Sequence, residues 1–249
     1  MPIRIAIPEP TSRDKEYNRR SLPPYVAALE AAGASVVVAP LDEPQEQVAK
    51  LLPGIDGILL PGSRYDVDPQ RYGEDRIAEC GEDDPARTAV DELLLQEAFA
   101  LRKPILAICH GAQTLNVWRS GSLIQDLRTS VNHRPGRDVV EAHAVEIMRG
   151  SKLSKLIRSS DLLETQVNSS HHQAIRAPGD NLVVSAVSPS DGVIEAIELD
   201  APDHFVLAVQ WHPERTYGQS PLSRAIFGAF VDAARMWQPL SIGKPASKR

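Results

Sequence analysis

The sequence has few cysteines and no long apolar segment. Only Cys80 and Cys109 occur among 249 residues, so the fold needs no disulfide framework and both thiols are expected to be reduced. No uninterrupted apolar run approaches the roughly 20 residues that cross a bilayer, and the start MPIRIAIPEP lacks the pattern of a signal peptide. We therefore expect a cytoplasmic protein that spans no membrane, with Cys80 as an exposed loop thiol.

The chain also lacks an excess of positive charge, internal repeats and low-complexity linkers. Its net charge is -6 and its basic residues are scattered, so nothing favours a nucleic-acid partner. With 42% hydrophobic residues there is ample material for one large core. We expect a single domain over residues 1–238, followed by a polar, frayed tail over residues 239–249.

Apolar runs and helix-like stretches alternate through the first part of the chain, which predicts a mostly parallel sheet flanked by helices. The expected strands of this part are Ile3–Ile7, Ser35–Ala39, Gly57–Leu60 and Pro104–Ile108. The expected helices are Pro24–Ala32, Arg87–Leu101 and, near the end of the chain, Leu222–Trp237. After residue 140 the extended runs are more closely spaced, which indicates antiparallel additions. These runs are Ala142–Met148, Leu163–Val167, Leu182–Val187, Val193–Leu199 and Phe205–Val209.

The segment PILAICHGAQTLNV, from Pro104 to Val117, carries the first sign of chemistry. Its apolar run ends at Cys109 and a helix-like stretch follows, so the thiol lies where a buried strand turns into a helix. The small residues Ala107 and Gly111 suit the crowded turn of a nucleophile elbow. A helix N-terminus at this point favours the thiolate. A lone cysteine is more often a small buried hydrophobe, so the interpretation depends on what accompanies it.

A second segment, AVQWHPE, supplies an imidazole and a carboxylate. The apolar run stops just before His212, and Pro213 has no N–H for a continuing strand ladder. In locally extended backbone, His212 and Glu214 share a face, so the carboxylate can orient the ring or stabilise its cation. A surface His–Glu pair is the alternative. Together with Cys109, these residues are the inventory of a thiol-based acyl-transfer enzyme.

At these residues the chain resembles class I glutamine amidotransferases, and among them the gamma-glutamyl-gamma-aminobutyrate hydrolases of peptidase family C26. Four further segments carry the resemblance: DGILLPGSRYDVDPQRYGE (56–74), SLIQDL (122–127), VNSSHHQ (167–173) and GVIEAIE (192–198). The resemblance implies a flavodoxin-like α/β fold with additional antiparallel strands. It also implies that Cys109 is the nucleophile, His212 the general base and Glu214 the residue that orients the base.

The loop after Leu60 is the next candidate, because ligands of parallel sheets bind beyond the carboxyl ends of the strands. The resemblance gives this loop a part in an oxyanion hole. The expected donors are the backbone N–H groups of Gly62 or Ser63, together with that of His110. An ordinary Pro-Gly turn is the alternative. The stretch Arg64–Glu74 is expected either to cover the pocket or to form a solvated surface loop.

The resemblance also implies which residues bind substrate. It places Gln113 near the substrate, although a first-turn helix residue that bonds a neighbouring loop is the alternative. It gives Ser170 and His171 a part in recognising a glutamyl group. For His172 a structural hydrogen-bonding role is equally open.

No metal or cofactor is expected. His171 and His172 are adjacent, and neighbours on an extended strand point to opposite faces, so the pair cannot readily share one ion. No Cys-x-x-Cys or His-x-x-x-His spacing supports a site elsewhere. Glu195 and Glu198 alternate along an expected strand, a pattern typical of a solvated face.

His110 competes with His212 for the role of base. Close relatives often carry arginine after the nucleophile, and AICHG also resembles the DJ-1/PfpI group, in which the histidine beside the cysteine is thought to serve catalysis. The QWHPE segment and Gln113 fit the amidotransferase pattern instead. We therefore expect His212 to be the base and His110 to face the substrate pocket.

The expected activity is cofactor-free hydrolysis of a small gamma-glutamyl amide through a glutamyl thioester, which releases glutamate and a free amine. One alternative is a glutaminase subunit that delivers ammonia to a separate synthetase. The others are a DJ-1/PfpI-like protein that uses His110 and a non-catalytic binding protein. Relatives often form dimers, so a homodimer is one expectation, although the sequence carries no interface motif.

Overall fold

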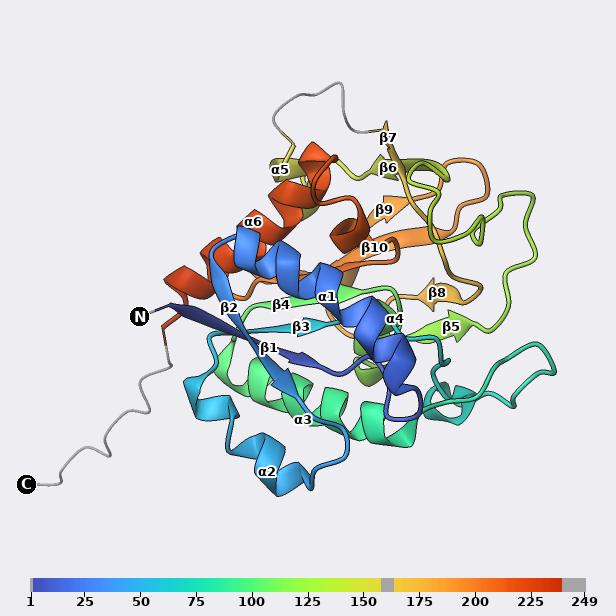
Figure 1. Cartoon of the computed structure of the whole chain (residues 1–249). Coiled ribbons are helices and arrows are strands. Elements are labelled where there is room, and N and C mark those ends of the chain that lie inside the picture. Colours follow the sequence, from blue (N-terminus) through green and yellow to red (C-terminus); the bar gives the residue numbers. More distant parts are fainter. Residues whose placement is uncertain (1, 158–163, 239–249) are drawn as a thin grey trace, which may run out of the picture.

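The fold is built on one mixed sheet. The structure, a computed structural model, describes residues 2–157 and 164–238, and the expected tail (239–249) lies outside these residues. Five parallel strands form one half of the sheet, in the order β2 (Ala34–Ala39), β1 (Ile3–Pro8), β3 (Gly57–Leu60), β4 (Ile105–Ile108) and β11 (Val206–Val209). Antiparallel strands continue it from β11, in the order β10 (Ile194–Leu199), β9 (Leu182–Val187), β6 (His143–Ile147) and β7 (Glu164–Val167). The expected parallel sheet with antiparallel additions is confirmed (Figure 1).

A small antiparallel pair lies beside this path. Strand β8 (Ala174–Ala177) pairs with β10 and with β5 (Ser122–Ile124). Neither strand was expected from the sequence, because both are short and neither coincides with a clear apolar run. The pair nevertheless matters, since the segment just before β8 holds Ser170 and His171, two of the residues expected to bind substrate.

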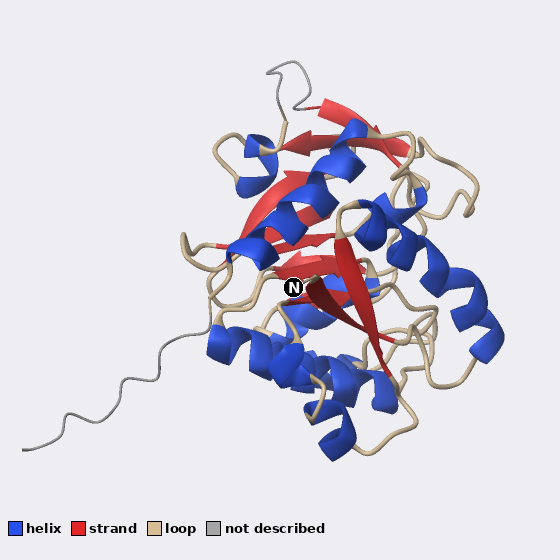
Figure 2. Cartoon of the chain, turned by 60° about the vertical axis from the view of Figure 1, so that its left-hand side comes forward, coloured by secondary structure: helices blue, strands red, loops and turns tan. Residues whose placement is uncertain are grey.

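Helices cover both faces of the sheet (Figures 1 and 2). One face packs against α1 (Lys15–Ala31) and α6 (Pro221–Met236), and the other against α3 (Pro85–Leu101) and α4 (His110–Trp118). Two shorter helices, α2 (Gln45–Ala49) and α5 (Lys152–Lys155), and three 3-10 turns at Leu52–Gly54, Pro69–Tyr72 and Pro213–Arg215 complete the described elements. None of the described helices is long and apolar enough to span a membrane.

Strand β4 shows why its sequence is uniformly apolar. Ile105 and Ala107 contribute to the core under α3 and α4, whereas Leu106 and Ile108 contribute to the core under α1 and α6. All four side chains are fully buried because both faces of the sheet are covered. Burial of each such large side chain contributes about 1.5–3 kcal/mol to folding. The strand therefore holds the residue that follows it, Cys109, on a rigid support.

The first helix is longer than expected. It begins at Lys15, nine residues before the expected Pro24, and the Asp14 carboxylate caps it by accepting from the Tyr17 N–H at 2.8 Å. Pro23 and Pro24 both lie inside the helix. Proline usually ends a helix because it lacks an N–H, which is why the sequence favoured a start at this point. The carbonyl of Arg20, which Pro24 cannot bond, accepts instead from the Arg137 guanidinium at 3.4 Å.

A buried ion pair on α3 includes an arginine that bonds the loops after two strands. Arg87 and Asp91 on α3 are both fully buried, with Arg87 Nε 2.7 Å from Asp91 Oδ1. The same guanidinium donates to the carbonyls of Pro10 at 2.9 Å and Pro61 at 2.7 Å. Because these carbonyls follow β1 and β3, Arg87 fixes the loop that carries Gly62.

Candidate active site

Cys109 occupies a strained turn between β4 and α4. Its backbone has φ 53° and ψ −110°, a left-handed conformation that residues with a side chain seldom adopt. Gly111 allows this turn, since a Cβ at that position would lie 2.3 Å from the carbonyl oxygen of Leu60 on β3. The geometry is that of a nucleophile elbow, as the small residues around the cysteine predicted.

The imidazole of His212 reaches the same edge of the sheet from β11. Strand β11 runs parallel to β4, and the Cys109 N–H donates to the carbonyl of Val209 at 2.8 Å. His212 Nδ1 lies 2.8 Å from Glu214 Oε1, and both side chains are buried. The expected contact is present, but the 3-10 turn Pro213–Arg215 produces it rather than extended backbone. Because Glu214 accepts from Nδ1–H, the other ring nitrogen, Nε2, carries the free lone pair.

Gly62 shows how close the thiol and the imidazole are. A Cβ placed on Gly62 would lie 3.0 Å from His212 Cε1 and 3.6 Å from Cys109 Cβ. The loop after β3, the elbow after β4 and the histidine after β11 therefore meet at one point. The absence of a side chain at Gly62 leaves the space between them open.

Asn168 fixes the backbone of His212. Its side-chain Nδ2 donates to the His212 carbonyl and its Oδ1 accepts from the His212 N–H, both at 2.8 Å. Asn168 is 2% exposed. Sequence reasoning did not single out Asn168, because its partner is the His212 backbone and leaves no side-chain pattern.

Burial keeps the Cys109 thiol and the His212 ring uncharged in the resting site. Burial raises the pKa of the Cys109 thiol to about 12, an effect that outweighs the lowering of that pKa by Arg215 and by the His110 N–H. The helix N-terminus favours the thiolate in the expected direction, through the His110 N–H, but desolvation dominates the pKa of the thiol in the resting site. Burial also lowers the pKa of His212, although Glu214 opposes it. In the resting site the thiol and the nearby imidazole are therefore both neutral.

Arg215 lies against this imidazole. Its Nη2 is 3.2 Å from His212 Nε2, the nitrogen that carries the lone pair. Its Nε is 3.5 Å from Glu214 Oε1, and its side chain is only 13% exposed. The Nε and Nη1 atoms of Arg215 are buried without a hydrogen-bond partner among the described residues. A guanidinium with unused donors therefore lines the site beside the candidate base.

The backbone donors near Cys109 differ in availability. The Gly62 N–H already donates to the hydroxyl of Tyr25, a buried residue of α1, at 3.0 Å. The Ser63 N–H makes no hydrogen bond among the described residues. The His110 N–H bonds toward the Cys109 sulfur and lowers the pKa of the thiol. Of the two expected donors in the β3 loop, Ser63 is thus the one that is free.

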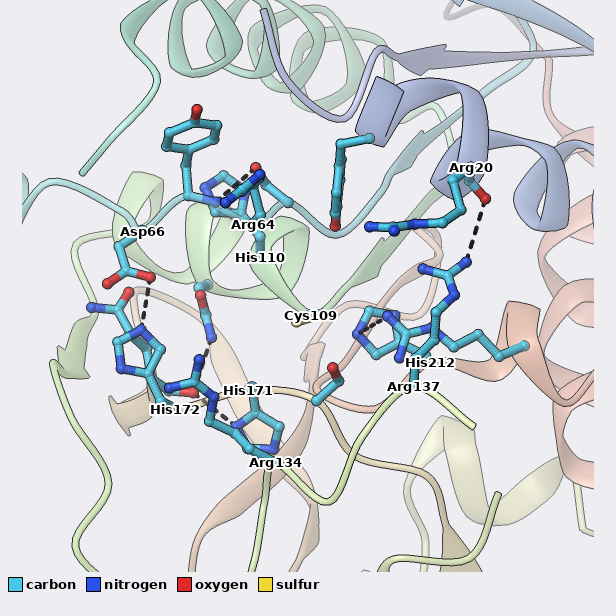
Figure 3. A pocket seen from close by; sticks show the side chains of 17 residues that line it. Arg20, Arg64, Asp66, Cys109, His110, Arg134, Arg137, His171, His172 and His212 are labelled. Carbon is cyan, nitrogen blue, oxygen red and sulfur yellow. Dashed lines mark hydrogen bonds and ion pairs between the residues drawn. The ribbon is translucent and has the colours of Figure 1, made fainter. Parts of the chain in front are cut away.

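A cavity of about 350 Å³ opens over Cys109. Figure 3 shows the cysteine at its centre, with labelled arginines reaching it from different elements. Arginine is the prevailing charged residue of the lining, and Asp66 is its only carboxylate among the described residues. The arginines that line it are Arg20, Arg64, Arg134, Arg137 and Arg215. A cavity with this charge balance attracts an anionic ligand.

The residues expected to bind substrate all line this cavity: Gln113, Ser170 and His171. Gln113 also donates to the Gln173 carbonyl and to Gln210 Oε1, each at 3.1 Å, so it does bond a neighbouring loop, and its contact with substrate stays a prediction. His110 lines the cavity as expected. Its Nδ1 lies 3.4 Å from Thr114 Oγ1 of the same helix, and burial lowers its pKa to about 3.

The longer loop after β3 contributes to the cavity wall at its start. Arg64, Tyr65 and Asp66 line the cavity. Asp66 Oδ1 lies 3.0 Å from His172 Nε2, and Asp126 Oδ1 lies 3.2 Å from His172 Nδ1. His172 therefore has the structural hydrogen-bonding role left open by the sequence.

Three sequence expectations about exposure are wrong. Cys80 is buried rather than an exposed thiol, because it lies under the Gln173 side chain, whose Nε2 is 3.5 Å from its sulfur.

Glu195 and Glu198 are buried on β10 rather than on a solvated face. Glu198 accepts from the N–H groups of Lys152 and Leu153 at the start of α5. Glu195 points into a group of histidines. Buried carboxylates with such partners cannot be told from exposed ones by alternation alone.

Comparison with known proteins agrees with this geometry. Residues 6–214 match the family Peptidase C26. The chain belongs to the peptidase C26 family. As a member of this family it is a hydrolase that acts on carbon–nitrogen bonds. The resemblance seen in the sequence motifs is thereby confirmed.

Relatives with similar sequences extend over most of the chain. A "Putative glutamine amidotransferase" of Mycobacterium tuberculosis is 40% identical over 82% of this chain, which spans 64% of that longer relative. The gamma-glutamyl-gamma-aminobutyrate hydrolase of Escherichia coli K12 is 35% identical, with 85% of each chain covered. A crystal structure of a "putative gmp synthase subunit a protein" of Thermoplasma acidophilum has a TM-score of 0.62 at 16% identity, covering 94% of this chain and 95% of that one. This last likeness bears on the fold, which is the one expected.

Proposed function

We propose that this C26 hydrolase cleaves small gamma-glutamyl amides through a thioester on Cys109. The observation that carries the proposal is the meeting of Cys109 with the hydrogen-bonded pair of His212 and Glu214, on the floor of a cavity lined by arginines. The similarity to gamma-glutamyl-gamma-aminobutyrate hydrolases supports the glutamyl half of the substrate. The excess of arginine supports a substrate whose amine half also bears a carboxylate, as gamma-aminobutyrate does.

In the first step the Cys109 sulfur attacks the gamma-carbonyl carbon while its proton passes to His212 Nε2. The tetrahedral oxyanion would accept hydrogen bonds from the Ser63 N–H, which has no acceptor among the described residues, and from the His110 N–H, which bonds toward the Cys109 sulfur in the resting site. His212 then gives the proton to the departing amine, and the carbon–nitrogen bond breaks. Glu214 orients the ring and stabilises its transient cation.

In the second step His212 removes a proton from water, which attacks the thioester carbon. The carbon–sulfur bond breaks, glutamate leaves and the thiol is restored. Arg215 must leave His212 Nε2 for either step, since its guanidinium now occupies the direction of that lone pair. A carboxylate of the bound substrate would draw Arg215 away through its unused donors, which couples substrate binding to release of the base.

Intact-protein mass spectrometry with a panel of gamma-glutamyl amides and glutamine tests the proposal. Turnover of one amide over glutamine, with a transient glutamyl adduct on Cys109, is the expected result. Cys109→Ser is the control that should form no thioester. Turnover of glutamine alone would instead identify a glutaminase that supplies ammonia to a synthetase. Silence with every substrate would return the chain to the DJ-1/PfpI-like or non-catalytic alternatives.

A paired substitution tests which histidine is the base. His212→Ala should abolish thioester formation, because Glu214 then has no ring to orient. His110→Ala should mainly weaken substrate binding, since the His110 ring has a hydroxyl rather than a carboxylate as its neighbour. Single-turnover assays distinguish the two effects, and the reverse ranking would overturn the assignment of His212.

A further inference from the structure

A buried group of three histidines and one glutamate lies beside the candidate active site. Its members are His133, His143, His171 and Glu195, and one nitrogen or oxygen of each lies within 4.8 Å of those of the others. Their side chains are at most 6% exposed. The four residues come from separate segments, which is why no spacing pattern in the sequence predicts them.

The nitrogens that face Glu195 Oε1 have no hydrogen-bond partner among the described residues. His133 Nδ1 lies 3.3 Å from this oxygen, and His143 Nε2 and His171 Nε2 each lie 3.6 Å from it. Both carboxylate oxygens of Glu195 are likewise without a partner in the described part of the chain. Unpaired polar atoms are costly in a protein interior, so this convergence needs a cause.

The other nitrogen of each ring is occupied by an oxygen. His133 Nε2 lies 2.9 Å from Asp191 Oδ2. His143 Nδ1 lies 3.0 Å from the Ala144 carbonyl, and His171 Nδ1 lies 2.9 Å from the Gln173 carbonyl. These oxygens hold the ring proton on the outer nitrogen, so three inner lone pairs and a carboxylate point at one another. The same outer contacts, a carboxylate or a backbone carbonyl on the second nitrogen, accompany histidines that bind metal ions.

We propose that His133, His143, His171 and Glu195 bind one divalent transition-metal ion, with Zn²⁺ as the ion that best suits the set. Three imidazoles and a carboxylate satisfy the tetrahedral coordination that Zn²⁺ prefers. An ion about 2.0–2.1 Å from each ligand keeps neighbouring ligand atoms about 3.4 Å apart in a tetrahedron. The separations of 3.3 and 3.6 Å around Glu195 match this value. The proposal departs from the expectation of no metal, which rested on the adjacent pair His171 and His172 and on the lack of a Cys-x-x-Cys or His-x-x-x-His spacing.

The ion would be structural, because four protein ligands close its coordination shell and leave no position for substrate. It would join the loop before β6, strands β6 and β10, and the segment before β8. The His133 carbonyl already accepts from the His171 N–H at 3.0 Å and from Ser169 Oγ at 2.8 Å. The site would therefore fix His171 in the cavity wall, and with it the loop that presents Arg134 and Arg137.

The direct test measures metal in the whole protein. The chain is produced with a tag that contains no histidine, purified without chelator and assayed by inductively coupled plasma mass spectrometry. We expect about one Zn²⁺ per chain. A metal-free sample made with a chelator should bind Co²⁺ and give the intense visible absorption of tetrahedral cobalt, and added Zn²⁺ should abolish this absorption and raise the melting temperature. Another divalent transition metal at one per chain would support the site and change only its ion.

Variants assign the metal to these residues. His143→Gln removes a ligand that does not line the cavity and should lose the metal. Asp191→Asn keeps all four ligands and should weaken metal affinity about 10–100-fold. His204→Gln is the matched control, since His204 is also buried but bonds the Lys103 carbonyl elsewhere in the fold. Wild-type protein that carries no transition metal and binds neither Zn²⁺ nor Co²⁺ would overturn the proposal, as would full metal content in His143→Gln.

Discussion

The Asn168 side chain bonds both backbone polar groups of His212, accepting from its N–H and donating to its carbonyl, each at 2.8 Å. The imidazole therefore owes its position to a side chain from the segment before β8, as well as to its own strand. This contact joins the segment that lines the cavity to the residue proposed as base.

Asn168→Ala should lower kcat about 100-fold, because loss of both bonds frees the His212 backbone and displaces the ring from the thiol. Steady-state kinetics with the preferred amide measure this effect. Asn116→Ala is the matched control: Asn116 is fully buried and bonds the carbonyls of Ser122 and Ala177, away from the cavity. It should lower the melting temperature and leave kcat of the folded fraction unchanged. Equal losses of kcat in both variants would contradict the positioning role of Asn168.

Removal of the charge at Arg215 should shift the pH profile. The Arg215 charge lowers the pKa of His212 and that of the Cys109 thiol. Without it both pKa values rise, so His212 becomes protonated at higher pH as the solution is acidified. The acid limb of kcat/KM, which reports the free enzyme, should therefore move to higher pH in Arg215→Gln. Arg215→Lys keeps the charge and should retain the wild-type limb; an unchanged limb in Arg215→Gln would contradict the argument.

Gly111→Ala should destabilise the protein severely. The added methyl would lie 2.3 Å from the Leu60 carbonyl oxygen, a backbone atom that cannot move without displacing β3. We expect a loss of about 3 kcal/mol or more in the free energy of unfolding. Gly228→Ala on α6 is the control, since a Cβ there has no neighbour within 4 Å. This variant should gain about 0.5–1 kcal/mol. Chemical denaturation measures both changes.

Arg87→Met should cost about 3–5 kcal/mol of stability, because it leaves the Asp91 carboxylate buried without a partner. It also releases the Pro61 carbonyl, so the loop with Ser63 should lose its fixed position and kcat should fall in the folded protein. Arg235→Met is the control, since its pair with Asp232 is more than half exposed on both sides. That change should stay within about 1 kcal/mol.

The sequence predicted the parallel half of the fold well, and the reason is physical. Strands β3 and β4 are covered on both faces, so each is a short, uncharged apolar run that ends where a loop begins. The chemistry at those ends was predicted for the same reason: Cys109 and His212 follow two buried strands. Their adjacency required only that β4 and β11 be neighbours, which the structure provides.

What the sequence could not predict depends on contacts between distant segments. The first half of α1 is polar and two prolines stand at its middle, so its helical state rests on packing and on the Asp14 cap. Glu195 follows the alternation of a half-exposed strand, yet its carboxylate lies against three histidines that enter from elsewhere. Asn168 bonds only backbone atoms. For Glu195 and Asn168 the decisive partner lies far along the chain and is invisible to local periodicity.

The proline pair in α1 leaves a backbone carbonyl of the helix without its usual helical donor. Pro24 cannot donate to the Arg20 carbonyl, and this leaves an acceptor on the helix surface into which the Arg137 guanidinium fits. Pro24→Ala would supply the helical hydrogen bond and so compete with Arg137 for the Arg20 carbonyl, leaving the bond from Arg137 to Ser21 Oγ at 3.4 Å to hold a loop more than a hundred residues away. Pro24 weakens its own helix, and it thus also affects how firmly the loop with Arg137 is held at the wall of the cavity. A substitution at Pro24, which contacts neither that wall nor a ligand in the cavity, can therefore change which ligands the cavity admits.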